Sequence, residues 1–424
     1  MPDSLSLRDV ALESGPRNGL FHEARRLGRT ERGVVGAAFL GWSLDAFDFF
    51  LLVFVLKDVA RTYHATLTEV TFALFLTLAA RPVGALFFGR LADSVGRKPV
   101  LMVVVALYPF FAFLSALAPT IGIFLLLRTL FGVAMGGEWG AGASLVMESI
   151  PPGCRGLVSG ILQAGYPFGY LLAALSYAWV YPLVGWRGLL MLGILPAFVV
   201  LLVRRQVPES AAFSERNQLK GSSRAGVFFF SWRTALFAIF LMTAFNFLGH
   251  GTQDLYPTFL ETMRGLAPGT VGAIAVLYNI GAVLGGVFLG ALSERIGRRR
   301  AILYAALAVF LVLPLWGFGG SIITITAGAF LMQCAVQGAW GVIPAYLNEI
   351  SPPALRGTFP GAVYQIGNLL AAANAPFQSH LAKFLGGRLD LALVAVAGVA
   401  ALSIALLIGR GPENRGEVLH CHDR

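Results

Sequence analysis

The feature that most constrains the fold of this chain is a succession of twelve apolar stretches that follow one another along almost its whole length. A helix needs roughly 20 mostly apolar residues to cross a bilayer, and each stretch is about that long. Strands of a membrane β-barrel would instead show segments of roughly 10 residues with alternating polarity. We therefore predict an all-α membrane protein whose spans lie at residues 33–56, 67–91, 99–117, 120–148, 156–180, 184–205, 233–258, 268–293, 300–317, 321–348, 357–383 and 388–410.

The composition excludes several other classes of protein. Hydrophobic residues make up 57% of the chain and charged residues 13%, whereas soluble chains carry about 25% charged residues. Such a chain is neither a soluble enzyme nor a disordered protein. The three cysteines, Cys154, Cys334 and Cys421, are too few and too scattered for a disulfide framework. The net charge of +10 comes from short loop clusters, so we expect no nucleic-acid partner.

The distribution of Lys and Arg predicts the orientation of the spans. Basic clusters precede span 1, follow spans 2 and 8, and occupy the connection between spans 6 and 7, whereas loops on the opposite side are poorer in them. Loops rich in Lys and Arg stay in the cytoplasm. The polar N-terminus lacks the apolar core of a signal peptide. We expect a multi-pass protein of the plasma (cytoplasmic or inner) membrane, with a cytoplasmic N-terminal tail (1–32), a six-helix half (33–205), a cytoplasmic linker (206–232), a second six-helix half (233–410) and a cytoplasmic C-terminal tail (411–424).

The two halves carry an internal repeat at one fixed offset of 201 residues. Three matches share this offset: residues 89–98 with 290–299, Trp139 with Trp340, and residues 148–156 with 349–357. Two like-oriented halves related by an axis along the membrane normal are a known plan for secondary transporters. In that plan the substrate site lies near the bilayer midplane, between the halves.

The loop after span 2 reads Gly-Arg-Leu-Ala-Asp-Ser-Val-Gly-Arg-Lys. It resembles the signature loop of the major facilitator superfamily. Arg97 and Arg298 have the charge to pair with Glu148 and Glu349, and glycine permits the tight turn. We predict either a latch that breaks and reforms as the halves rock, or a static anchor for the loops. Its residues are Gly89, Asp93, Gly96, Arg97, Glu148, Arg155, Glu294, Gly297, Arg298, Glu349 and Arg356.

Ionisable side chains within the spans are candidates for function, because each costs roughly 2.5–3.5 kcal/mol on insertion scales. We expect Arg128 and Glu138 to form a structural pair, with Glu138 as a secondary proton candidate. Arg81 either pairs with an aspartate of span 1 or binds a substrate carboxylate. The candidates for carrying a proton are Asp45, Asp48, Glu138, His250 and Asp254.

Span 7 carries a stripe of hydrogen-bonding side chains, Asn246, His250 and Gln253, which cannot face lipid. The segment from Asn246 to Thr258 resembles the span-7 pattern of the lactate and pyruvate:proton symporters of the yeast lactate permease type, within the sialate:proton symporter family. Gly249 departs from that pattern, which has Ser or Thr there. The resemblance also implies that Arg81 is the family's span-2 arginine and that Gln365 and Asn368 are its span-11 polar pair. Further polar candidates to bind substrate are Gln163, Tyr166, Tyr278 and Asn279.

These residues predict a proton-coupled secondary active symporter of small monocarboxylates, lactate or pyruvate, that works by alternating access. One alternative is a symporter of sialic acid or another organic acid, with aromatic or dicarboxylic acids ranked after sialic acid, and one of another class is a ligand sensor on a transporter fold. No nucleophile–base constellation or phosphate-binding loop occurs, so we expect no enzyme. We also expect no cofactor besides the proton and no metal site. The expected partners are a small carboxylate, the proton and the lipid bilayer, and the resemblance implies a monomer.

Overall fold

The computed structural model describes residues 27–195, 198, 205, 207–210, 213–214, 232–416 and 419. The predicted N-terminal tail up to residue 26, most of the predicted linker 206–232 and the last residues of the chain lie outside this part.

The first half is built of α-helices with short turns. Thr66 and Glu69 form a reciprocal capping box at the start of the second helix. Gly96 turns the chain into the next helix at a φ of 114°, a conformation that favours glycine. The helices are α2 (Arg29–Thr62), α3 (Leu67–Val95), α4 (Arg97–Ala116), α5 (Ile121–Gly136), α6 (Glu138–Ser149), α7 (Arg155–Trp179) and α8 (Tyr181–Leu192), with a 3₁₀ turn η2 (Pro152–Cys154) before α7.

The second half repeats this order. Gly297, at a φ of 94°, makes the turn that Gly96 makes in the first half. The helices are α12 (Trp232–Gln253), α13 (Tyr256–Thr262), α14 (Pro268–Ile296), α15 (Arg298–Phe318), α16 (Ile322–Trp340), α17 (Ile343–Glu349), α18 (Phe359–Ala371), α19 (Asn374–Phe384) and α20 (Leu389–Arg410), with a 3₁₀ turn η3 (Pro353–Leu355) before α18. The predicted all-α fold is confirmed.

Ten helical segments of the described chain are long and apolar enough to cross a membrane. Each corresponds to one of the twelve predicted spans. Of the other two, predicted span 11 is divided between α18 and α19 by a break at Ala372 and Ala373. Predicted span 6 begins in α8, and most of its remainder lies outside the described residues.

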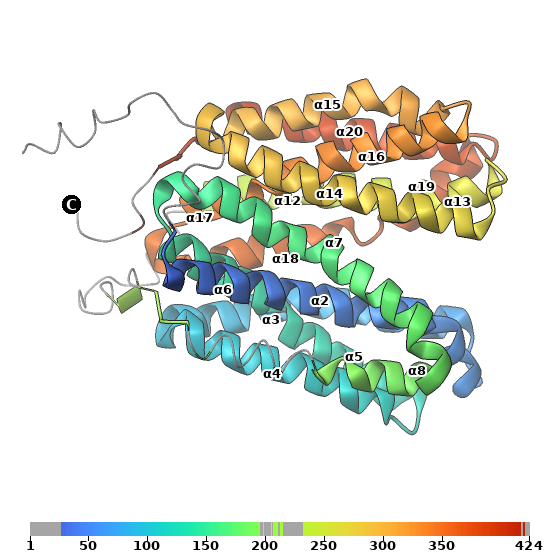
Figure 1. The fold of residues 1–424 in the computed structure, drawn as a ribbon, viewed down its shortest axis with the longest axis horizontal. Helices are drawn as coiled ribbons and strands as arrows, with labels where there is room; N and C mark the ends of the chain where they lie inside the picture. The colour runs from blue at the N-terminus through green and yellow to red at the C-terminus, as the bar shows by residue number, and fades with distance from the viewer. Residues whose placement is uncertain are drawn as a thin grey trace, which may run out of the picture.

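The helices form two bundles that lie side by side (Figure 1). α2 begins and α20 ends at the same face, on the left of the view; we name it the terminal face. Between the bundles, α7 packs on α14 and α3 packs on α18. Glycine allows the backbones to approach: a Cβ on Gly160 would lie 2.4 Å from the carbonyl oxygen of Gly286, and one on Gly140 2.7 Å from the Cα of Gly361.

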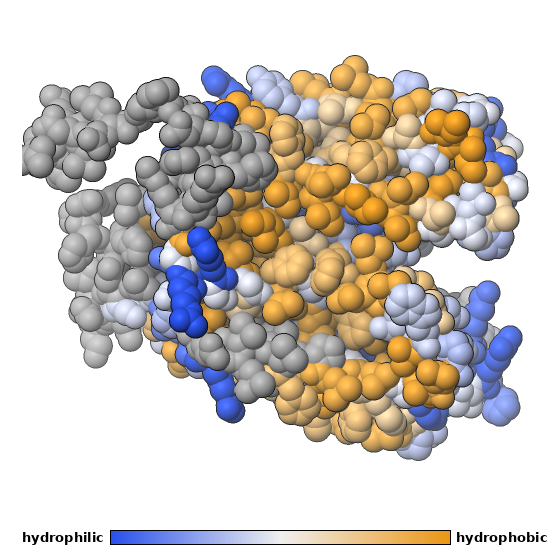
Figure 2. Space-filling view, in the orientation of Figure 1, coloured by the Kyte–Doolittle hydropathy of each residue, from blue (hydrophilic) through white to orange (hydrophobic). Residues whose placement is uncertain are grey.

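The surface matches a protein embedded in lipid. Figure 2 shows apolar residues over the flanks of both bundles and hydrophilic residues near the two ends. The same view shows a notch between the bundles at the face opposite the terminal face, where the two halves separate. The structure is therefore closed at the terminal face and hollowed at the opposite one.

Candidate functional site

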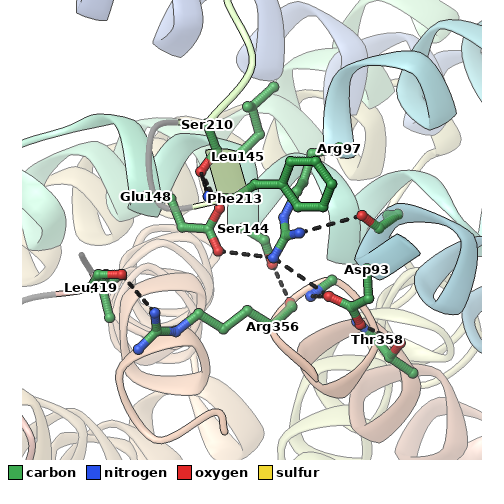
Figure 3. A network of polar contacts seen from close by, with 12 residues as sticks. Asp93, Arg97, Ser144, Leu145, Glu148, Ser210, Phe213, Arg356, Thr358 and Leu419 are labelled. Atoms are coloured by element: carbon green, nitrogen blue, oxygen red, sulfur yellow. Dashed lines mark hydrogen bonds and ion pairs between the residues drawn. The ribbon is translucent and has the colours of Figure 1, made fainter. Parts of the chain in front are cut away.

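Two carboxylates hold the halves together at the terminal face. Asp93, near the end of α3, accepts hydrogen bonds from the amides of Gly357 (2.8 Å) and Thr358 (3.0 Å) and from the Thr358 hydroxyl (2.7 Å) (Figure 3). Glu294, at the equivalent place on α14, accepts one from the amide of Gly156. Gly156 and Gly357 are equivalent positions in the repeat, so each half caps the helix start of the other.

Each carboxylate is held by a buried arginine of its own half. Arg97 lies 3.4 Å from Asp93 and 3.0 Å from Glu148. Arg298 lies 3.0 Å from Glu294 and 2.9 Å from Glu349. The structure thus brings together both pairs that the sequence predicts, and each arginine joins the cap to a second helix end.

The remaining residues of the predicted latch lie around these pairs. A Cβ on Gly89 would lie 2.7 Å from the Cα of Thr358, so glycine is needed for this approach. Arg155 donates to the carbonyl oxygen of Met147 at 3.0 Å. Arg356 donates to the carbonyl oxygen of Leu419 at 2.8 Å, and its own carbonyl oxygen accepts from the hydroxyl of Ser144 in the other half (Figure 3).

Two glutamates of this network at the terminal face were not predicted from the sequence. Glu209 accepts from the amides of Arg97 (3.1 Å) and Lys98 (3.0 Å). Glu413 accepts from those of Arg298 (3.1 Å) and Arg299 (2.9 Å). The sequence does contain a signal for them, because Pro-Glu-Ser at 208–210 matches Pro-Glu-Asn at 412–414, just beyond the last span of each half.

A cluster of charges is buried in the middle of the first half. Its members are Asp45, Asp48, Arg81, Arg128 and Glu138, and each side chain is at most 3% exposed. Arg81 acts electrostatically on Asp45, Arg128 acts on Asp48, and Glu138 acts on both aspartates. Asp48 acts electrostatically on Arg128, and the predicted pair of Arg128 with Glu138 stays a prediction. Within the described chain, neither aspartate accepts a hydrogen bond.

Arg81 lies at the boundary of this cluster with the second half. Its guanidinium stands 5.1 Å from the ring centre of Phe49 and donates to the sulfur of Met135. It also acts electrostatically on Tyr166 and, across the boundary between the halves, on His250 and Tyr364. Arg81 is therefore the member of the cluster that acts electrostatically on residues of the second half.

His250, on α12, joins two helices of the second half. Its Nδ1 lies 3.3 Å from Asp254 and its Nε2 lies 3.1 Å from Oδ1 of Asn368, on α18. Both partners present acceptor oxygens, so both ring nitrogens are satisfied when the imidazole carries two protons. The side chains of His250 and Asp254 are 31% and 38% exposed, which keeps them accessible to water.

The three side chains of the polar stripe of span 7 have separate hydrogen-bond partners. Asn246 donates to the carbonyl oxygen of Met242 on its own helix, and Gln253 donates to Gln333 of α16 at 2.8 Å. The amide of Asn279 likewise bonds within its own helix, and Tyr278 beside it is buried. Backbone carbonyl oxygens of the same helix therefore accept from two of the predicted amides, Asn246 and Asn279. The spacing of residues in the sequence does not reveal this competition with a ligand.

Two other predicted amides keep an acceptor free. Gln163 on α7 and Gln365 on α18 are 6% and 1% exposed, and Oε1 of each has no hydrogen-bond donor within the described chain. Both belong to helices that line the boundary between the halves. They remain candidates to bind a substrate hydroxyl or a protonated group.

A group of aromatic residues at the candidate site was not predicted from the sequence. Trp139 stands beside the break between α5 and α6, and Trp340 beside the break between α16 and α17. Tyr364 lies between them, with ring centres 4.7 Å from Trp139 and 5.5 Å from Trp340. The two tryptophans mark the repeat in the sequence, but their approach through a third ring is visible only in the folded chain.

Known proteins share this architecture. The sialic acid transporter NanX of Escherichia coli is 26% identical over 388 residues, which cover 89% of this chain and 94% of NanX. A carboxylic acid transporter protein homolog of Saccharomyces cerevisiae is 28% identical over 371 residues, 81% of this chain and 60% of that protein. Among solved structures, the proton:xylose symporter XylE matches with a TM-score of 0.78 at 16% identity, over 92% of this chain and 98% of that one.

The family match covers both halves. The sequence pattern of the Major Facilitator Superfamily matches residues 38–267 and again residues 239–419, as the internal repeat requires. Together with the two bundles, the reciprocal caps at the terminal face and the charges buried between spans, this match shows a multi-pass membrane transporter and not an enzyme. The chain belongs to the Major Facilitator Superfamily.

Proposed function

We propose that this transporter is a proton-coupled symporter of small organic monocarboxylates that works by alternating access. The observation that carries the proposal is the charge balance of the buried cluster. Three carboxylates, Asp45, Asp48 and Glu138, face two guanidiniums, Arg81 and Arg128. In a medium of low dielectric this leaves one negative charge uncompensated, and one proton neutralises it.

Coupling follows from the position of Arg81 between the cluster and the second half. With Asp45 ionised, its carboxylate attracts Arg81 electrostatically. When Asp45 takes up the proton, the guanidinium is free to hold a substrate carboxylate through two parallel hydrogen bonds. Proton and substrate then favour each other's binding, which is the reciprocity that symport requires.

The charges favour a monocarboxylate over a dicarboxylate. Arg81 is the cation of the cluster that faces the second half. Arg128 is fully buried, between the rings of Phe124 and Phe131, and faces Asp48. A second substrate carboxylate would therefore meet no free cation of the cluster.

The identity of the acid remains the finer part of the proposal. The pattern of span 7 favours lactate or pyruvate. The names of the relatives favour organic acids of more than one kind, since one transports sialic acid and another is a carboxylic acid transporter homolog. An uptake test must therefore offer a panel of acids.

The test is uptake of labelled L-lactate, pyruvate, benzoate and sialic acid into proteoliposomes with an acidic exterior, corrected for flux into protein-free liposomes. We expect the protein to accumulate at least one monocarboxylate and the pH gradient to drive this accumulation. Asp45→Asn should abolish the accumulation but keep exchange of internal for external acid, because the charge is neutralised permanently. Glu261→Gln, at an exposed position on α13, is the matched control.

Two outcomes would contradict the proposal. One is the absence of uptake of every monocarboxylate by folded, reconstituted protein. The other is full pH-driven accumulation in each of Asp45→Asn, Asp48→Asn and Glu138→Gln, since the proton would then be carried elsewhere.

A further inference from the structure

A continuous row of aromatic rings crosses the boundary between the halves. Its ring centres are separated by 5.5 Å from Tyr166 to Trp42, 6.5 Å from Trp42 to Trp139, 4.7 Å from Trp139 to Tyr364 and 5.5 Å from Tyr364 to Trp340. We name these five residues the aromatic row. They come from α2, α6 and α7 of the first half and α16 and α18 of the second.

The aromatic row lies next to the cation of the proposed site. Arg81 acts electrostatically on Tyr166 at one point of the row and on Tyr364 at another. It also acts on His250, which bonds to Asn368 one turn along α18 from Tyr364. The row and Arg81 therefore lie near one another at the boundary between the halves.

Buried donors in this region have no acceptor. The indole N–H groups of Trp42 and Trp139 and the Nε of Arg81 make no hydrogen bond within the described chain. Trp42 and Trp139 are each 2% exposed and Arg81 is 3% exposed. Buried donors left without a partner cost free energy, and a carboxylate is an acceptor that satisfies several of them at once.

We propose that the substrate is a planar ring acid, an aromatic or conjugated monocarboxylate whose ring lies against the aromatic row while its carboxylate faces Arg81. This inference rests on the proposed function and specifies its substrate. Rings gain from offset or edge-to-face contact with other rings, by about two- to tenfold in affinity for each pair beyond the apolar area buried. A three-carbon acid such as lactate has a carboxylate for Arg81 but no ring face for the row.

The architecture explains why the row suits a transported ligand. Trp139 and Trp340 stand at helix breaks in equivalent spans of the two halves. Tyr364 contacts both, so a ligand on Tyr364 contacts both halves through it. Rocking of the halves would therefore change the contacts of a ring bound there.

The experiment compares two acids that differ in the ring alone, benzoate and cyclohexanecarboxylate, with L-lactate as a third ligand. Their affinities are measured by calorimetry on the purified full-length protein at one fixed pH. We expect benzoate to bind about tenfold or more tightly than either other acid. Trp139→Leu and Tyr364→Leu should reduce the benzoate preference to about threefold or less, whereas Trp179→Leu, which removes a tryptophan that is 71% exposed, should leave it unchanged.

The outcomes separate this inference from the proposed function. The ring-acid proposal is wrong if the unmodified protein binds benzoate and cyclohexanecarboxylate equally, or binds L-lactate more tightly than benzoate. Either result is still compatible with a monocarboxylate symporter. Failure of every monocarboxylate to bind overturns both. If the leucine variants do not fold, the affinities of the three acids for the unmodified protein still test whether it prefers a ring acid.

Discussion

A methyl group added at Gly160 should open the terminal face. The Cβ of an alanine there would lie 2.4 Å from the carbonyl oxygen of Gly286 and 2.9 Å from the Cα of Val287, both backbone atoms of the other half. An ordinary contact of this kind is at least about 3.4 Å, so α7 and α14 must separate by roughly 1 Å. Overpacking of this size costs about 1–3 kcal/mol.

The overpacking at residue 160 destabilises only the conformation that is closed at the terminal face. The contact between Gly160 and Gly286 exists where the halves are closed at the terminal face, and it is lost when they separate there. A penalty of about 1–3 kcal/mol on the closed state shifts the equilibrium toward the state open at this face by roughly 5- to 150-fold. The two halves themselves need not change, since the added methyl group touches neither core.

Two alanine variants on the same half provide controls. Gly169→Ala places its Cβ 2.2 Å from the carbonyl oxygen of Ser43, but α7 and α2 belong to the same half. It should lower stability without opening the terminal face. Gly142→Ala has its nearest neighbour at 3.9 Å and should change neither property.

The assay is a distance between spin labels at the terminal face. Arg90→Cys on the first half and Arg300→Cys on the second occupy exposed positions there, in a background without the native cysteines. Pulsed electron resonance should show a larger long-distance population in Gly160→Ala than in the parent or Gly142→Ala. An unchanged distribution in folded Gly160→Ala, or an equal change in Gly169→Ala, would refute the reasoning.

Three further predictions use the same protein. Asp93→Asn weakens three hydrogen bonds to the other half, so the label distance should shift in the same direction as in Gly160→Ala, by an amount that corresponds to about 1.5–3 kcal/mol. Glu413→Gln weakens two caps on α15, and thermal unfolding in detergent should show a loss of roughly 0.5–1 kcal/mol. Asp48→Met leaves Arg128 buried without its carboxylate and should cost about 3–5 kcal/mol in unfolding experiments, whereas Asp48→Met with Arg128→Met should recover most of that loss.

Apolar length and the repeat predict most of the architecture. The spans follow from the cost of exposing backbone polar groups to lipid, a constraint that acts on each segment by itself. The equivalence of Arg97 with Arg298 likewise follows from the aligned halves, and the structure places both in the same contacts. Features that are local or repeated can thus be found without the fold.

The features that escaped prediction depend on contacts between distant segments. Hydropathy does not mark the break at Ala372, because the apolar stretch continues across it. The amide of Arg97 donates a hydrogen bond to Glu209, which is 112 positions further along the chain. In the sequence, the segment around Glu209 has the composition of an ordinary polar loop. Spacing within one span likewise suggests only Glu138 as a partner for Arg128, whereas in the packed bundle Asp48 of another helix acts electrostatically on it.

The repeat also shows how the two tasks of the proposed symporter are divided. At the terminal face the four charged residues of the predicted latch in the first half each have a counterpart of the same charge at the offset of 201 residues: Asp93 with Glu294, Arg97 with Arg298, Glu148 with Glu349 and Arg155 with Arg356. At mid-span none of the buried cluster does: Asp45 corresponds to Asn246, Asp48 to Gly249, Arg81 to Ala282, Arg128 to Ala329 and Glu138 to Ala339. A rocking motion between two like halves needs matched contacts on both sides of the axis, so symmetry suits the latch. The proposed proton site needs one excess negative charge. A symmetric copy of the cluster in the second half would double both the desolvation cost and the number of protons. The absence of these charges from the equivalent positions of the second half is therefore what a single coupling site requires.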